Sequence, residues 1–160
     1  MKLVEIKEGN TSILVPEFEE GLGPKKSGDK VFYNPAMQLN RDVSISFLKY
    51  WSNKNKRILD GMGATGIRGI RIANETEVKN VDITDISEDA NKLIKKNILK
   101  NDLKNVNAVH EAIEIQILEN RYDYHYIDID PFGTPIPYFP IAAEYVSHEG
   151  VIAVTATDTA

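Results

Sequence analysis

The sequence predicts a Rossmann-like α/β fold, in which a mostly parallel, doubly wound sheet follows a small N-terminal β-hairpin. From Arg57 onward, segments with strand periodicity alternate with segments of helical periodicity, as expected for consecutive βαβ units. The first of these strands also runs into a glycine-rich turn that opens a helix. Since ligands of such sheets bind beyond the carboxyl ends of the strands, the residues that follow each strand are the candidates for function.

The N-terminal part is expected to contain a hairpin, a loop and a helix. Residues 3–8 and 11–15 read as two short strands around a Gly-Asn-Thr turn. Residues 19–35 are rich in Gly, Pro and Lys and are expected to be loop. A helix is expected to begin near Asn40. Its apolar face would consist of Val43, Phe47, Leu48 and Trp51.

The α/β core is expected to contain five strands and four helices. The strands are predicted over residues 57–62, 80–86, 105–111, 122–130 and 150–157. The helices between them are predicted over residues 65–75, 87–101, 112–120 and 135–147. We therefore expect residues 1–53 to cover a ligand site and residues 54–160 to form the core. Because the sequence stops just after the fifth strand, we expect a fragment of a longer protein with an incomplete core.

Composition limits the classes of function. A chain of 160 residues suits one domain, and its net charge of −5 gives no global basic surface for nucleic acid. It has no cysteine, which excludes disulfides and thiolate zinc sites within this chain, and we expect no metal site. Neither a membrane span nor a signal peptide is visible. We therefore expect a cytoplasmic protein with no membrane or protein partner.

The glycine-rich turn after the first core strand is typical of a cofactor loop. Gly61, Gly63 and Gly66 match G-x-G-x-x-G, which permits a tight turn and a close approach of the backbone to a ligand. Asp60 at the mouth of the loop would repel the pyrophosphate of a dinucleotide. It suits S-adenosylmethionine (SAM), which carries an ammonium and a sulfonium and no phosphate. A plain strand-to-helix turn is the alternative.

The next two strand ends supply groups for an adenosine. Asp85 follows the second core strand, where a carboxylate can accept hydrogen bonds from ribose hydroxyls. Its alternative role is to cap the next helix together with Ser87. Glu111 and Ala112 follow the third strand, where an adenine edge would lie, although Glu111 could simply begin a helix.

The fourth strand ends in Asp130, Pro131 and Phe132. A carboxylate can accept a hydrogen bond from an exocyclic amine and stabilise the positive charge that develops during methylation. The carbonyl of Pro131 can act as a second acceptor, and the ring of Phe132 can stack on a base. Asp128, one pleat earlier on the same side, would be a supporting acceptor. A simple turn is the alternative, since Pro and the following glycine both favour one.

With these strand ends in place, the sequence resembles the Trm1 family of tRNA (guanine(26)-N2)-dimethyltransferases, archaeal type. The resemblance rests on "VFYNPAMQLNRDVS", "LDGMGATGIRGIR", "DISEDA", "DIDPFGTPIPY" and "VTATDTA". It implies a SAM-dependent methyltransferase fold and an enzyme that transfers one or two methyl groups to N2 of guanine 26 in tRNA. It also implies a C-terminal tRNA-binding domain, which is absent from this sequence.

The resemblance also implies roles for individual residues. The SAM contacts fall on Arg41, Arg68, Asp85, Glu111 and Ala112, and Glu111 stands where the archaeal pattern tends to have Asp. Asp130 would be the catalytic carboxylate, with Phe132 beside the target base.

Arg41 and Arg68 each lie near a helix start, where a cation gains nothing from the helix dipole, so a ligand carboxylate would explain them. Surface salt bridges are the alternative. Phe32, Tyr33 and Asn34 are expected to belong to a lid over the cofactor and the guanine pocket, and core packing is the other reading of that segment.

Other functions remain open from the residues alone. They are another amino-methyltransferase acting on DNA adenine, rRNA or a protein amide, a nicotinamide-dependent oxidoreductase, and an inactive methyltransferase-fold module. Local basic candidates for RNA are Lys25, Lys26, Lys30, Lys95, Lys96, Lys100 and Lys104. The last four are expected to form a solvated helix face.

Overall fold

The computed structural model describes residues 2–18, 31–78 and 80–157. Its first element is an antiparallel hairpin of β1 (Leu3–Glu8) and β2 (Thr11–Pro16), in which Glu8 faces Thr11 across the turn. Gly9 in that turn has φ +55°, a conformation that glycine adopts without strain. The predicted hairpin is confirmed. It packs through β2 on helices rather than joining the main sheet.

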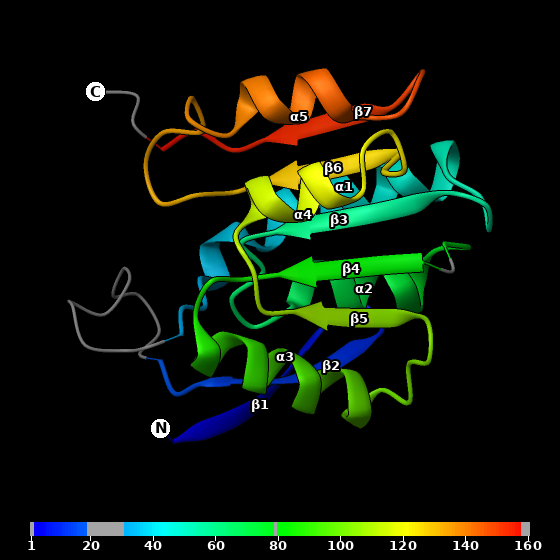
Figure 1. Ribbon diagram of the computed structural model, residues 1–160. Helices are drawn as coiled ribbons and strands as arrows, with labels where there is room; N and C mark the ends of the chain where they lie inside the picture. The colour runs from blue at the N-terminus through cyan, green and yellow to red at the C-terminus, as the bar shows by residue number, and fades with distance from the viewer. Residues whose placement is uncertain (1, 19–30, 79, 158–160) are drawn as a thin grey trace.

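The main sheet is parallel and has five strands in the order β5-β4-β3-β6-β7. The strands are β3 (Arg57–Gly61), β4 (Asn80–Thr84), β5 (Val106–Val109), β6 (Tyr126–Ile129) and β7 (Val151–Val154). The chain moves outward from β3 to β5 and then returns to the other side of β3 for β6, so the strand order reverses between β3 and β6. Figure 1 shows all five arrowheads at one edge of the sheet, which is where a ligand site is expected.

Helices cover both faces of the sheet, as a doubly wound fold requires (Figure 1). They are the short 3-10 helix η1 (Pro35–Met37), α1 (Gln38–Trp51), α2 (Ile67–Glu75), α3 (Glu88–Lys100), α4 (Ile113–Glu119) and α5 (Phe139–Tyr145). One core cluster contains residues of α1, α2, α3 and the hairpin, and a second contains residues of α4 and α5. A smaller third cluster joins Val31 to α3. Ile58 and its neighbour Leu59 in β3 belong to different cores, which is the alternation expected of a strand buried on both faces.

Two predictions about the helices are wrong in part. Val43 and Phe47 in α1 are 62% and 39% exposed, whereas the buried side chains of this helix are Arg41, Ile45 and Leu48. The helix turns this side inward because Ile45 and Leu48 join the core, while Arg41 meets a buried carboxylate of the hairpin. Sequence periodicity does not predict a buried arginine.

The last helix was expected from residue 135 but begins at Phe139. The backbone of Pro135 instead accepts hydrogen bonds from the amides of Tyr138 and Phe139, so the residues before the helix form a turn.

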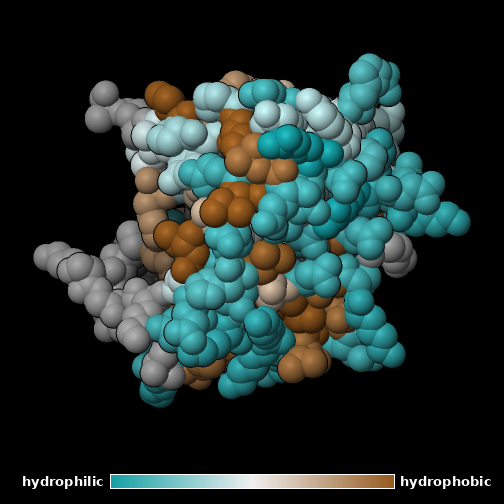
Figure 2. Space-filling view, viewed as in Figure 1, coloured by the Kyte–Doolittle hydropathy of each residue, from teal (hydrophilic) through white to brown (hydrophobic). Residues whose placement is uncertain are grey.

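Figure 2 shows a largely hydrophilic surface opposite the arrowheads, with more hydrophobic residues toward the arrowhead edge. The described residues contain no helix that is long and apolar enough to cross a membrane.

Candidate active site

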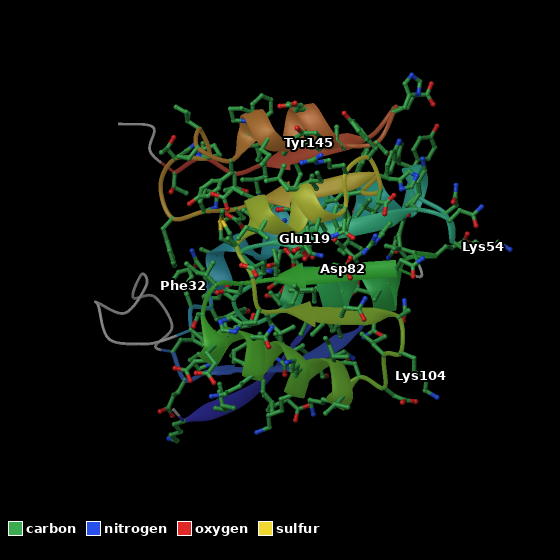
Figure 3. The ribbon with its side chains drawn as sticks, viewed as in Figure 1. Phe32, Lys54, Asp82, Lys104, Glu119 and Tyr145 are labelled. Carbon is green, nitrogen blue, oxygen red and sulfur yellow. The ribbon has the colours of Figure 1, made fainter. Side chains whose placement is uncertain are left out.

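A cavity of about 690 Å³ lies at the carboxyl ends of the strands, a size typical of small-molecule sites. It is lined by the segment before α1, by the glycine-rich turn, and by the residues after β4, β5 and β6. Figure 3 shows Phe32 at this edge of the sheet. The residues predicted for the site that line the cavity are Phe32, Asn34, Arg41, Asp60, Gly63, Arg68, Asp85, Glu111, Ala112, Asp130, Pro131 and Phe132.

Three predicted residues do not line the cavity but support its wall. Gly61 is buried, and a Cβ at this position would lie 2.1 Å from Cδ1 of Ile113 and 2.8 Å from the carbonyl oxygen of Asp128. Gly66 has φ +78° and stands immediately before α2, so it makes the left-handed turn into that helix. Asp128 is 1% exposed and accepts a hydrogen bond from the hydroxyl of Tyr126 at 2.8 Å.

Asp60 both lines the cavity and caps α2. Gly66 has no side chain with which to cap the helix, and Oδ2 of Asp60 accepts a hydrogen bond from the amide of Gly69 at 2.8 Å. The carboxylate therefore occupies a helix N-terminus that a pyrophosphate would otherwise use. Burial is the largest cause that raises the pKa of Asp60, to about 7, and the charge of nearby Asp128 raises it further.

Asp85 holds the glycine-rich turn in shape. Its Oδ2 accepts from the amide of Ala64 at 2.9 Å, and its Oδ1 accepts from the amide of Ser87 at 2.8 Å. The capping role is therefore present, since Ser87 in turn is the N-cap of α3. Each carboxylate oxygen has a second lone pair, so these two hydrogen bonds leave Asp85 able to accept from a ligand as well.

Glu111 closes the wall after β5. Its Oε1 accepts from the amide of Ala112 at 3.0 Å, while its carbonyl accepts from the hydroxyl of Thr84 at the end of the neighbouring strand. Helix α4 then begins at Ile113 without a side-chain cap. Glu111 thus precedes the helix rather than starting it, and its carboxylate stays at the cavity edge.

Arg68 joins the acidic side chains at the ends of β3 and β6. Its Nη2 donates to Oδ2 of Asp130 at 2.6 Å, and its Nε lies 3.3 Å from Oδ1 of Asp128 and 4.0 Å from Oδ1 of Asp60. Burial acts to lower the pKa of Arg68, but the carboxylates, Asp128 first among them, raise it above its ordinary value. The guanidinium therefore stays charged. For Asp128, in contrast, burial is the main cause that raises the pKa.

The other end of the same guanidinium is bound to α1. Nη1 of Arg68 donates to Oδ1 of Asn40 at 2.8 Å and to Oγ of Ser44 at 3.0 Å. The salt-bridge alternative for Arg68 therefore describes its contacts here, although the bridges are buried rather than on the surface. Oδ1 of Asp130 remains able to accept a hydrogen bond, since the described residues include no hydrogen-bond partner for this oxygen.

The Asp-Pro-Phe segment lies at the cavity mouth. Pro131 is buried, whereas Phe132 is 81% exposed and meets Phe32 edge-to-face, with ring centroids 5.0 Å apart. Two aromatic rings from segments a hundred residues apart in sequence therefore border the opening next to Asp130. Asn34 supports this border, because its side chain accepts from the amide of Ala36 and starts η1.

Arg41 has a partner that the sequence did not indicate. Its Nε and Nη2 donate to the two carboxylate oxygens of Glu8 at 2.8 and 2.5 Å, and Nη2 also donates to the carbonyl of Asn34 at 3.1 Å. The salt bridge foreseen as an alternative is therefore present, but it is buried. Arg41 still lines the cavity.

Further cavity residues were missed from the sequence. Apolar or weakly polar groups are the commonest among them: Met37, Met62, Ala64, Thr65, Ile67, Thr84, Ile86, Ile113, Tyr138 and Thr157, together with Glu114. Tyr33, expected in the lid segment, also lines the cavity. Ile86 and Ile113 directly follow predicted residues, and their apolar side chains are suited to a flat ring.

The basic candidates do not gather at the cavity. Lys25, Lys26 and Lys30 lie outside the described residues. Lys95, Lys96, Lys100 and Lys104 are exposed, and Lys100 pairs with Glu5 at 3.0 Å. Figure 3 shows Lys104 at the edge of the sheet opposite Phe32. No group of His, Cys, Asp or Glu in the described part of the chain is arranged to hold a metal ion.

Comparison with known proteins finds a matching family and relatives that share its description. Residues 9–160 match the family described as N2,N2-dimethylguanosine tRNA methyltransferase. A tRNA (guanine(26)-N(2))-dimethyltransferase of Methanococcus aeolicus is 40% identical over 97% of this chain and 43% of the relative. Its counterpart from Pyrococcus abyssi is 39% identical over 100% of this chain and 44% of the relative. The chain thus spans less than half the length of these relatives.

Solved structures agree with the fold. Trm1 from Pyrococcus horikoshii, solved with S-adenosyl-L-methionine, has a TM-score of 0.85 and 36% identity over 98% of this chain and 43% of its own. A tRNA m1G37 methyltransferase of M. jannaschii, at 20% identity, has a TM-score of 0.73 over 94% of this chain and 42% of its own. At that identity the second match shows the fold alone.

Proposed function

Because the chain belongs to the family of N2,N2-dimethylguanosine tRNA methyltransferases, we propose that it forms the cofactor-binding and catalytic part of a SAM-dependent enzyme. The enzyme transfers one or two methyl groups to the exocyclic N2 of guanine 26 in tRNA. We also propose that it is cytoplasmic and of the archaeal type. The observation that carries the proposal is the position of Asp130, which lies beside an exposed aromatic ring at the mouth of a cavity suited to SAM.

The cavity fits SAM better than a dinucleotide. Its volume suits a ligand of that size, and carboxylates from the ends of β3, β4 and β5 line it. Asp60 occupies the N-terminus of α2 and would repel a pyrophosphate, whereas it attracts an ammonium or a sulfonium. Asp85 and Glu111 can accept hydrogen bonds from hydroxyl and amino groups of an adenosine, and Ile86 and Ile113 offer apolar contact.

Residues 1–53 take part in the site as a cover. Phe32, Asn34 and Arg41 come from this part of the chain and line the cavity opposite the strand ends. Arg68 of the core holds the cover in place, because its Nη1 donates to Oδ1 of Asn40 and to Oγ of Ser44 in α1. Residues 54–160 supply the acidic groups and the Asp-Pro-Phe segment. We propose that the cover encloses the bound cofactor, while the core supplies the groups that take part in methyl transfer.

The chain's residues then act as follows. SAM, when bound, would supply an electrophilic methyl group. Once this group is transferred, the sulfonium of the cofactor becomes a neutral thioether. Phe132 stacks on the guanine and holds the amino group near Asp130. Oδ1 of Asp130 accepts a hydrogen bond from the N2 amine, stabilises the positive charge that grows on this nitrogen, and takes up the released proton. Arg68 keeps Asp130 oriented by binding Oδ2.

The test is the product formed on unmodified tRNA. We expect methylated guanosine at position 26 by mass spectrometry, and no product on tRNA with adenosine at that position. Asp130→Asn should reduce the rate by about 10²–10⁴, the usual contribution of general acid–base groups. Asp123→Asn is the matched control, because Asp123 is an exposed carboxylate that also pairs with an arginine, Arg57, at 3.2 Å. Methylated adenosine, or an Asp130→Asn enzyme as fast as wild type, would refute the proposal.

A further inference from the structure

We propose that Glu8, in the N-terminal hairpin, is a positioning residue that orients Arg41 toward the carboxylate of the cofactor's amino-acid tail. Glu8 itself does not line the cavity, whereas Arg41 does. The inference rests on the proposed function, because it assigns a subsite to the cofactor proposed there. It makes the hairpin, which lies outside the main sheet, part of the ligand site.

Glu8 is built into the structure as an acceptor. It is 2% exposed, and its two oxygens accept a bidentate pair of hydrogen bonds from Nε and Nη2 of Arg41, at 2.8 and 2.5 Å. The hydroxyl of Tyr33 donates to Oε1 of the same carboxylate at 2.6 Å, and Nη1 of Arg71 lies 3.3 Å from Oε2. Arg41 and Tyr33 both line the cavity, so one buried carboxylate holds two of its wall residues.

The charges of this cluster favour an ionised Glu8. Burial alone would raise its pKa, but the hydrogen bonds from Arg41 and Tyr33, together with the positive charges, hold the pKa below its ordinary value. Arg71 is in turn shared with Asp42 at 2.7 Å and Glu75 at 2.9 Å. Glu8 therefore remains a full negative charge, which binds a guanidinium in one plane more firmly than an amide could.

The pairing leaves one end of Arg41 available. Nε and Nη2 are used by Glu8 and the carbonyl of Asn34, whereas the described residues include no hydrogen-bond acceptor for Nη1. Arg41 is buried and lines the cavity, so its two remaining N–H groups are the part of the guanidinium that a ligand could use. Such a group suits a carboxylate, and of the parts of SAM only the amino-acid tail carries one.

The inference predicts selectivity rather than a general loss of binding. S-Adenosylhomocysteine carries the tail, and 5′-methylthioadenosine shares the adenosine and sulfur but lacks it. In Glu8→Gln the side-chain amide would direct N–H groups toward Arg41, so that its two-pronged contact is lost. We expect the affinity for S-adenosylhomocysteine to fall roughly tenfold, the scale of one charge-assisted hydrogen bond. The affinity for 5′-methylthioadenosine should change less than about twofold on the same reasoning.

Glu75→Gln is the matched control. Glu75 also anchors the hairpin, because it accepts from the hydroxyl of Thr11 and pairs with Arg71, but it makes no contact with Arg41 among the described residues. It should lower the melting temperature without changing the ratio of the two affinities. Glu8→Asp retains the charge and shortens the side chain, and should show a smaller loss of the same selective kind.

Isothermal titration calorimetry of the purified proteins with both ligands gives the decision. An equal loss for both ligands in Glu8→Gln and Glu8→Asp would mean a purely structural role, and unchanged binding would mean none; either result overturns the inference. Wild-type protein that binds neither ligand would instead overturn the proposed function, and the inference with it.

Discussion

The buried carboxylate of Asp60 should make stability depend on pH in a way that one substitution removes. The folded protein raises the pKa of Asp60 from 3.8 to about 7, with burial as the main cause and Asp128 and Asp130 adding to it, while Arg68 opposes the shift. The folded state therefore binds this proton more tightly than the unfolded state. The resulting stabilisation is fully present below pH 4 and is lost as the pH rises through 7.

The magnitude follows from the size of the shift. Roughly three pKa units at about 1.4 kcal/mol each correspond to a total of ~4 kcal/mol between the extremes of pH. Most of this change, about 2.5 kcal/mol, falls between pH 5 and pH 8. In Asp60→Asn the side chain does not titrate, and its amide oxygen can still accept from Gly69. The variant should therefore gain this amount relative to wild type as the pH rises.

Urea denaturation of both proteins without ligand, at pH 5 and pH 8, measures the effect. Comparing the two proteins cancels the titration of groups that they share. Leu48→Ala is the control, because it removes fully buried apolar atoms and no charge, so its cost of about 2–5 kcal/mol should be the same at both pH values. If the difference between Asp60→Asn and wild type does not change with pH, Asp60 is not a carboxylate with a raised pKa in the folded protein.

Two other substitutions test the base contact and the cavity wall. Phe132→Ala should leave the free energy of unfolding within about 0.5 kcal/mol, because the ring is 81% exposed. It should lower kcat/KM for tRNA by roughly 10–100-fold, the worth of one base–aromatic stack, as measured by methyl transfer from labelled SAM. Gly61→Ala should destabilise the protein by about 1–3 kcal/mol in urea denaturation, because its Cβ would lie 2.1 Å from Ile113 and 2.8 Å from a carbonyl oxygen.

The outcomes that contradict these expectations are distinct. A Phe132→Ala enzyme with normal kcat/KM would show that the guanine is held elsewhere, and Phe132→Tyr, which keeps the ring, should restore most activity. A Gly61→Ala protein as stable as wild type would show that the wall between β3 and α4 yields easily. Gly133→Ala is a useful comparison for space alone, because a Cβ there would meet nothing within 4 Å, although its φ of +87° still disfavours alanine.

The alternation of strands and helices could be read from the sequence because it depends on local periodicity. Each of the five core strands and four core helices lies within its predicted segment, and the glycine-rich turn has the predicted place between β3 and α2. Parallel strands connected by helices bring their carboxyl ends to one edge, so Asp60, Asp85 and Asp130 could be expected near one another. The cavity at that edge includes all three.

The errors arose where contacts between distant segments decide the outcome. Val43 and Phe47 are apolar and helically spaced, yet α1 buries Arg41 because Glu8, thirty-three positions earlier, meets it. The start of α5 moved to Phe139 because the turn before it takes up the first amides. Local pattern contains no information about either partner.

By itself, the sequence determined the order of the elements, the edge at which the cavity lies, and the acids and rings available there, because periodicity and spacing act over a few residues. Only the tertiary structure decided how the charges are paired: Arg68 with Asp130 across sixty-two positions, and Arg41 with Glu8. Pairing of buried charges depends on distances of a few ångströms between separate segments, and these distances exist only after the chain has folded.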